Sequence, residues 1–100
     1  DARIREFEER SRSLGQTEIF IEAPYRNDQL FKAITSNCRP QTMLSLAIDL
    51  TGPTEEIGAK NISEWRRSPP PQLHKRPTVF LLLADNPRSA KRRRRTNHAH

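Results

Sequence analysis

The run TVFLLLA, Thr78–Ala84, is the feature that most limits what this chain can fold into. A strand with apolar side chains at consecutive positions buries both of its faces, so it belongs in the middle of a covered sheet. The run is far too short to span a membrane, which takes roughly 18 or more apolar residues in a row. No segment of that length and character occurs in the sequence, so we expect no membrane partner.

The spacing of the other apolar residues predicts helices alternating with strands. Ile4, Phe7 and Leu14 share one face of a predicted helix, and Asn27 and Asn61 are expected to cap two more. The expected helices are 2–14, 27–38 and 62–67, and the expected strands are 18–22, 43–49, 57–61 and 78–84. This alternation indicates an α/β fold with a small layered sheet of about four strands and flanking helices.

The net charge of +6 is confined to one end of the chain. Six of the 18 basic residues lie from Arg88 to Arg95, so the remainder carries 12 basic and 12 acidic residues. We expect one α/β domain over residues 1–86 and a disordered basic tail over 87–100. Arginines in this tail can hold phosphates by charge alone; they are Arg92, Arg93, Arg94 and Arg95. A solvated tail or a localisation signal is the alternative interpretation.

The sequence lacks the motifs that usually carry catalysis. The chain contains no Gly-rich nucleotide loop and no nucleophile elbow, and His98 and His100 alone do not predict a metal site. Cys38 is the only cysteine, so it cannot form an internal disulfide, which favours a reducing, cytoplasmic location. We expect Cys38 to be a buried spacer and His74 to be a surface or capping residue. No catalytic residue is predicted.

Two segments that follow predicted strands are the candidate binding elements. The elbow Pro24–Arg26 places an aromatic ring and a guanidinium at the carboxyl end of a strand, where ligands usually bind in α/β sheets. Tyr25 and Arg26 are therefore expected to bind substrate, although such a pair can equally cap a neighbouring helix. The segment DLTGPTEE, Asp49–Glu56, exposes backbone after the next strand, where it can pair with adenine or simply form a capped turn. Trp65 is expected to anchor the third helix to the sheet, with base stacking as the alternative.

Three ordered motifs resemble the C-terminal half of the tetrapyrrole methylase family, in the branch of the ribosomal RNA ribose methyltransferases. They are QTEIFIEAPYRNDQLF, IDLTGPTEEI and EWRRSPPPQLHKRPTVFLLLA, and the resemblance covers about Ile4 to Ala84. The family's strand-end motif corresponds to Glu22–Arg26, and its acidic-Leu-Thr-Lys-x-x-Glu segment corresponds to Asp49–Glu55. Gly52 stands where the family has Lys, and Lys75–Thr78 stands where it often has Lys-Gly-Glu.

The resemblance implies an enzyme with two α/β domains that holds S-adenosylmethionine in the cleft between them. This chain would then be the second domain and would need an N-terminal domain with a Gly-rich loop, without which we expect no activity. Main-chain groups of Leu50 and Thr51 are implied near the adenine of the cofactor, and Tyr25 and Arg26 near the substrate. The methyl acceptor would be an RNA or a small molecule.

Two other hypotheses stand beside this one. In the first, the chain is a stand-alone RNA-binding α/β module that uses the Arg-rich tail. In the second, it is mainly a dimerisation surface, and the chain forms a homodimer through the apolar cleft face that is exposed when the first domain is missing.

Overall fold

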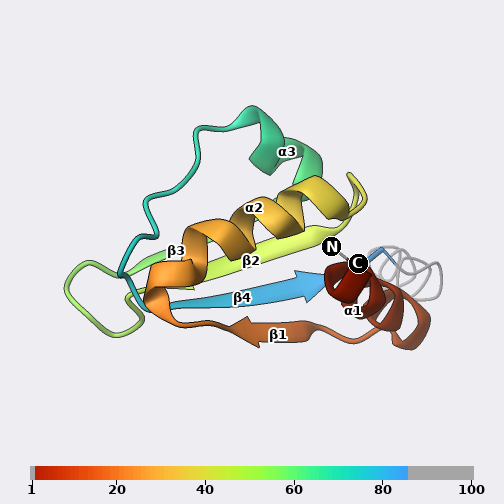
Figure 1. Cartoon of the computed structure of the whole chain (residues 1–100), viewed down its shortest axis with the longest axis horizontal. Coiled ribbons are helices and arrows are strands. Elements are labelled where there is room, and N and C mark those ends of the chain that lie inside the picture. The colour runs from red at the N-terminus through yellow and green to blue at the C-terminus, as the bar shows by residue number, and fades with distance from the viewer. Residues whose placement is uncertain (1, 86–100) are drawn as a thin grey trace, which may run out of the picture.

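The computed structural model describes residues 2–85, and these form one sheet with three helices packed against it (Figure 1). The expected α/β layered sheet with flanking helices is confirmed. The helices are α1 (Ala2–Leu14), the 3₁₀ turn η1 (Pro24–Arg26), α2 (Asn27–Asn37) and α3 (Ile62–Arg67). The strands are β1 (Glu18–Ile21), β2 (Met43–Ile48), β3 (Glu56–Asn61) and β4 (Thr78–Leu83).

The four strands lie in the order β1-β4-β2-β3, and every neighbouring pair is antiparallel. Since β1 and β2 are each antiparallel to β4, they run in the same direction, and their carboxyl ends meet at one end of the sheet (Figure 1). This arrangement brings the segment after β1 and the segment after β2 to the same end of the molecule. The sequence pattern alone could not determine that these two segments lie at the same end.

The core lies between one face of the sheet and the helices. Leu44, Leu46 and Ile48 of β2 alternate with residues that point the other way, as a strand requires. The remaining buried apolar residues of this layer come from the helices, β4 and the connector before β4: Ile4, Phe31, Ile34, Cys38, Ile62, Trp65, Leu73, Phe80 and Leu82.

The expectation that β4 is buried on both faces is half wrong. β4 does lie in the middle of the sheet, between β1 and β2. Its residues, however, alternate between buried and half-buried, because Thr78, Phe80 and Leu82 face the helices while Val79 and Leu81 lie on the other face. A strand such as β4 can therefore be central in the sheet and apolar at consecutive positions without helices covering its second face.

The third helix follows the sequence closely. Asn61 caps α3, since its Oδ1 accepts the backbone N–H of Glu64 at 2.9 Å, and the Glu64 carboxylate accepts the N–H of Asn61 at 3.0 Å. This reciprocal pair is a capping box. Trp65 is the expected anchor, because it is buried, donates Nε1–H to the carbonyl of Leu44 at 2.8 Å and packs edge-on against Phe31.

Two expectations about the first two helices were wrong. Leu14 is exposed, and α1 instead buries Ile4, Glu8 and Ser11. The Glu8 carboxylate accepts hydrogen bonds from the N–H of Arg39 and the hydroxyl of Thr42, at 2.7 and 2.6 Å. Asn27 does not cap α2, and its side chain takes part in a tertiary contact described below. In both helices, polar side chains with distant hydrogen-bond partners thus occupy buried positions that the sequence pattern did not predict.

Candidate functional site

The elbow after β1 is a single 3₁₀ turn held at both ends. Pro24 occupies its first position, and the N–H of Arg26 donates to the carbonyl of Ala23 at 2.8 Å. The carbonyl of Pro24 accepts the N–H of Lys75 from the connector before β4 at 3.3 Å. Tyr25 is 61% exposed, and the Arg26 guanidinium lies over its ring, 5.5 Å from the centroid. The pair therefore projects from a fixed corner.

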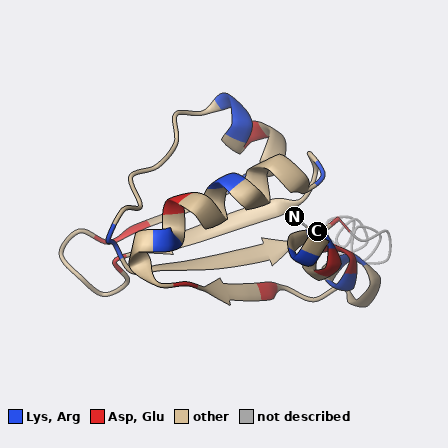
Figure 2. Ribbon diagram, viewed as in Figure 1, with Lys and Arg blue, Asp and Glu red and all other residues tan. Residues whose placement is uncertain are grey.

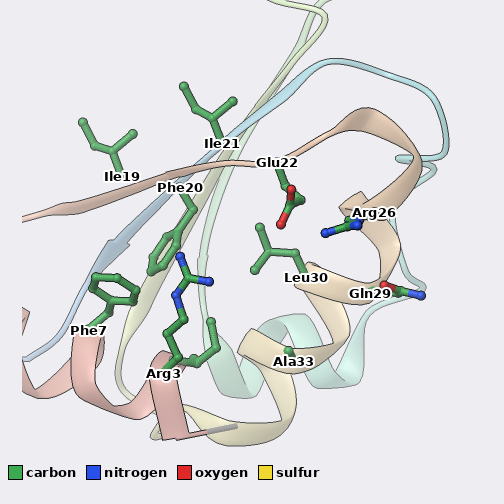
Figure 3. Close-up of a pocket in the computed structure, with 11 residues that line it drawn as sticks. Arg3, Phe7, Ile19, Phe20, Ile21, Glu22, Arg26, Gln29, Leu30 and Ala33 are labelled. Carbon is green, nitrogen blue, oxygen red and sulfur yellow. The ribbon is translucent and has the colours of Figure 1, made fainter.

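Beside this elbow is a groove of about 340 Å³, bounded by β1, α1 and α2; we call it the β1 groove (Figure 3). Phe20 and Leu30 form an apolar floor, while Glu22 and Arg26 point into the groove from its η1 end (Figure 3). Phe7 packs edge-on against Phe20 with centroids 5.0 Å apart. The groove can accept a ligand with an apolar body, and Arg26 offers a positive charge at its rim.

The segment after β2 is a hairpin loop that joins β2 to β3. Asp49 and Thr51 have positive φ angles of 52° and 65°, in the left-handed region that non-glycine residues rarely occupy. The loop holds this backbone with its own side chains: Glu55 Oε1 accepts the N–H of Thr51 at 2.8 Å, and Asp49 Oδ2 accepts the hydroxyl of Thr54 at 2.8 Å. Leu50 is 52% exposed at the tip.

Arg76, in the connector before β4, bonds both this loop and the start of α2. Its Nε donates to Asp49 Oδ2 at 2.8 Å, and its Nη2 donates to the carbonyl of Thr54 at 3.0 Å and to Glu56 Oε1 at 3.2 Å. The Arg76 carbonyl accepts the side-chain amide of Asn27 at 2.6 Å. One residue thus links the start of α2 to the β2–β3 loop. We call Asn27, Asp49 and Arg76 the strand-end junction.

The two charged residues of the junction stabilise each other's charged forms. Hydrogen bonds from Arg76 and then Thr54 lower the pKa of Asp49 from its ordinary value of 3.8. In turn, the hydrogen bond to Asp49 raises the pKa of Arg76. Asn27 is fully buried, and its Oδ1 has no protein hydrogen-bond partner while its Nδ2 bonds the carbonyls of Leu73 and Arg76.

Sequence reasoning missed Arg76, although a signal was present. Arg76 stands directly before the last strand, and the loop from Asp49 to Glu56 has an acidic residue at each end. Because arginine offers several donors in a fixed planar fork, it is suited to bridging such a set of acceptors. The segment after β1, which contains the predicted residues Tyr25 and Arg26, lies at the same end of the sheet as the β2–β3 loop, which contains Leu50 and Thr51 (Figure 1).

The remaining candidates lie elsewhere. Cys38 is buried as expected, and burial followed by the nearby Glu8 carboxylate raises its pKa from 9.0 to about 12, so it is not an activated nucleophile. His74 is exposed. Arg92–Arg95, His98 and His100 lie outside the described residues. Within residues 2–85 no group of three His, Cys, Asp or Glu residues is arranged to hold a metal ion, and no helix there is long and apolar enough to cross a membrane.

No family model matches the chain, and no curated protein matches it significantly. The function must therefore be argued from the residues and the site.

Proposed function

We propose that this chain forms the C-terminal part of an S-adenosylmethionine-dependent methyltransferase and contributes one wall of the cleft for cofactor and methyl acceptor. One observation carries the proposal. The two segments that resemble methylase motifs, Pro24–Arg26 and Asp49–Thr51, follow different strands and lie at one end of the sheet. The connector before β4 joins them, because the N–H of Lys75 donates to the carbonyl of Pro24 and the side chain of Arg76 bonds Asp49. Two motifs without a common role would not need to converge.

The backbone at the β2–β3 loop supports an adenine-binding role. No described residue donates a hydrogen bond to the carbonyls of Leu50 and Thr51, whereas the N–H of Thr51 is already bonded to Glu55. Carbonyl acceptors suit the amino group of adenine, which is a donor. Leu50, exposed beside them, offers an apolar contact for the purine ring.

At the elbow, the chemistry supports recognition of an anion. Within residues 2–85 the Arg26 guanidinium forms no ion pair, and it lies at the rim of the β1 groove beside Tyr25. We assign to Arg26 the binding of an anionic group of the methyl acceptor or of the cofactor's carboxylate, with Tyr25 packing at the rim. The sulfonium of S-adenosylmethionine supplies an already activated methyl group, so this chain's residues contribute position rather than acid–base catalysis.

The first test is to determine the coding sequence upstream of Asp1. The proposal expects an open frame of about 100–150 residues, a typical domain length, that contains a Gly-rich loop after a predicted strand. Calorimetric titration should then detect cofactor binding to the joined protein and none to the present chain. A start codon directly before Asp1, or a joined protein that does not bind the cofactor, would contradict the proposal.

A variant pair tests the site within the joined protein. Arg26→Ala should weaken binding of the acceptor or the cofactor by about tenfold or more, the usual cost of a lost charge-assisted hydrogen bond. Arg67→Ala removes an exposed arginine from α3, away from the sheet end, and should change neither. Equal binding by all three proteins would remove Arg26 from the site.

The concentration of basic residues in the tail supports a second candidate, a stand-alone RNA-binding module. If four arginines each neutralise one phosphate of a single strand, the logarithm of the affinity should fall with the logarithm of salt concentration with a slope of about −3. Truncation after Pro87 should abolish that dependence. RNA binding that survives truncation would place any RNA contact on the α/β body instead.

A further inference from the structure

The face of the sheet opposite the helices is uncharged. Ile19 and Ile21 of β1 point away from Phe20 and the helices (Figure 3). Strand alternation and register place eleven residues on this open face: Ile19, Ile21, Met43, Ser45, Ala47, Ile57, Ala59, Asn61, Val79, Leu81 and Leu83. None is charged, although 30% of the chain's residues are. Strands β2 and β4 carry no charge along their whole length (Figure 2).

The isoleucines on the two edge strands of the open face are exposed, while Val79, Leu81 and Leu83 of β4 are half-buried. Ile21 is 75% exposed, Ile57 is 69% exposed and Ile19 is 63% exposed. Single exposed apolar residues are normal on protein surfaces, but a contiguous apolar patch marks an interaction site. These residues are contiguous, because the register aligns Ile21, Val79, Ala47 and Ile57 in one row across all four strands. We therefore expect another molecule or segment, called the cover below, to pack against the open face.

The chemistry of the chain limits what that cover can be. Residues 86–100 contain only two apolar residues, Ala90 and Ala99, so that segment cannot shield the open face. The strand-end junction lies at the end of the sheet, and the β1 groove lies along its edge, where it includes only Ile19 and Ile21 of the open face. A partner at either site would therefore leave most of the open face uncovered. The cover must be an uncharged apolar surface.

The relief of the open face is self-complementary. β1 and β4 carry large side chains and form a ridge, with Leu81 at its centre. β2 and β3 form a trough of small side chains at Ser45, Ala47 and Ala59, bounded by Met43 and Ile57. A two-fold axis parallel to the strands places the ridge of one copy over the trough of another, whereas an axis perpendicular to them would set ridge on ridge.

We propose that the open face is an isologous interface that binds a second copy of this chain, with the two-fold axis parallel to the strands. The register then sets Leu81 of one copy against Ser45 of the other, Ile19 against Ala59, and Ile21 against Ile57. Each large side chain of the ridge meets a small residue, except at the border of the trough. The proposal does not depend on methyl transfer.

The size of the face predicts the strength of the dimer. Four strands about 4.8 Å apart and up to six residues long, at about 3.3 Å each, span roughly 20 Å by 20 Å. That is about 400 Å² in projection, below the roughly 800 Å² per partner of a standard stable interface. We therefore expect a dimer that dissociates in the micromolar range.

The first experiment measures self-association of the full chain by sedimentation velocity from about 1 to 500 μM, the range set by a small interface. Wild-type protein should convert from monomer to dimer across it. Ile21→Lys and Ile57→Lys should each weaken dimerisation by about 100-fold, because a charge would be buried without a partner. The control, Leu14→Lys, changes an exposed leucine on α1 and should leave dimerisation unaltered. A monomer at every concentration, or equal effects of all three variants, would overturn the proposal.

The second experiment tests the axis. Ile21→Cys and Ile57→Cys proteins, each made with Cys38→Ala, should form a disulfide readily when mixed and oxidised, since β1 of one copy faces β3 of the other. Each protein alone should crosslink poorly. Crosslinking of Ile21→Cys with itself would place β1 against β1 and overturn the proposed axis. A wild-type dimer that disappears when an upstream domain is restored would show that this domain, and not a second copy, is the natural cover.

Discussion

At the scale of single residues, the strand-end junction shows how one side chain can order a loop. The loop after β2 contains two non-glycine residues with positive φ, Asp49 and Thr51, and such conformations persist only where the surroundings fix them. Arg76 supplies that fixation through bonds to Asp49, Thr54 and Glu56. A lysine at position 76 would keep the charge but could not make this set of contacts from a planar fork.

The junction makes a pH prediction. The pKa of Asp49 is lower in the folded chain than its ordinary value of 3.8, so the unfolded chain binds a proton first as the pH falls. The stabilisation is therefore complete above about pH 4 and is lost as the pH drops through the folded pKa. Urea unfolding at pH 7 and at pH 3 measures the free energy of unfolding at each pH. Between the two, this free energy should fall more for wild type than for Asp49→Asn. An equal loss would contradict the assigned partner.

Cys38 makes a prediction at the opposite end of the pH range. Burial and the Glu8 carboxylate raise its pKa from 9.0 to about 12, so the unfolded chain releases the thiol proton first as the pH rises. This stabilisation is present below pH 9 and is lost between pH 9 and 12. The variant Cys38→Ala is expected to be less stable at pH 7 but to lose less stability between pH 8 and 10.5. Rapid alkylation of the native thiol would contradict the burial.

At the scale of elements, α3 is a helix of six residues whose order depends on its cap and its anchor. A helix this short is not stable in isolation. The capping box of Asn61 and Glu64 fixes its start, and Trp65 fixes it to β2 through the carbonyl of Leu44. Arg66 adds bonds to the carbonyls of Thr35 and Cys38 at 2.6 and 2.8 Å, which join α3 to the end of α2.

Replacing the cap should destabilise the chain measurably. Asn61→Ala removes the acceptor for the N–H of Glu64 and should lower the free energy of unfolding by about 1 kcal/mol, within the range of 0.5–2 for caps. Asn61→Ser or Asn61→Asp should restore most of it, since both side chains can cap. Chemical denaturation of the four proteins at pH 7 measures these differences. If Asn61→Ala left the free energy of unfolding unchanged, tertiary contacts alone would hold α3 in place.

At the scale of the whole molecule, the helices form one layer against one face of the sheet. α1, α2 and α3 all contribute to the core on the side of Phe80 and Leu82. The other face carries apolar but partly exposed residues, including Val79 and Leu81 of the same strand. Two adjacent leucines of β4 therefore differ in environment, although their sequence neighbourhoods are nearly identical.

This difference predicts a contrast between neighbours. Leu82→Ala leaves a cavity in the core and should cost about 2–5 kcal/mol of stability. Leu81→Ala, on the open face, should cost clearly less in dilute solution, where the chain is a monomer. Thermal or urea unfolding measures the free energy of unfolding of both variants. The protein is kept at about 1 μM, a concentration at which a dimer with so small an interface is expected to be dissociated. Equal losses would mean that the second face of β4 is covered within the monomer.

The sequence by itself determined the order of the elements, the α/β class and the cap of α3. These follow from local rules: periodicity separates strands from helices, and an Asn followed three residues later by Glu starts a helix. It also placed the elbow Pro24–Arg26 directly after a strand. Local chemistry is sufficient there, because proline fixes φ and the next residues have few alternatives.

Only the tertiary structure decided which face is covered, which ends meet and where the buried polar groups find partners. Antiparallel pairing with β4 set the carboxyl ends of β1 and β2 side by side. Asn27 bonds Leu73 and Arg76, 46 and 49 residues away, instead of capping α2. Such contacts depend on which distant segments become neighbours. An apolar run predicts only that a strand prefers burial. It does not predict whether the strand's second face is covered by its own chain or by another molecule.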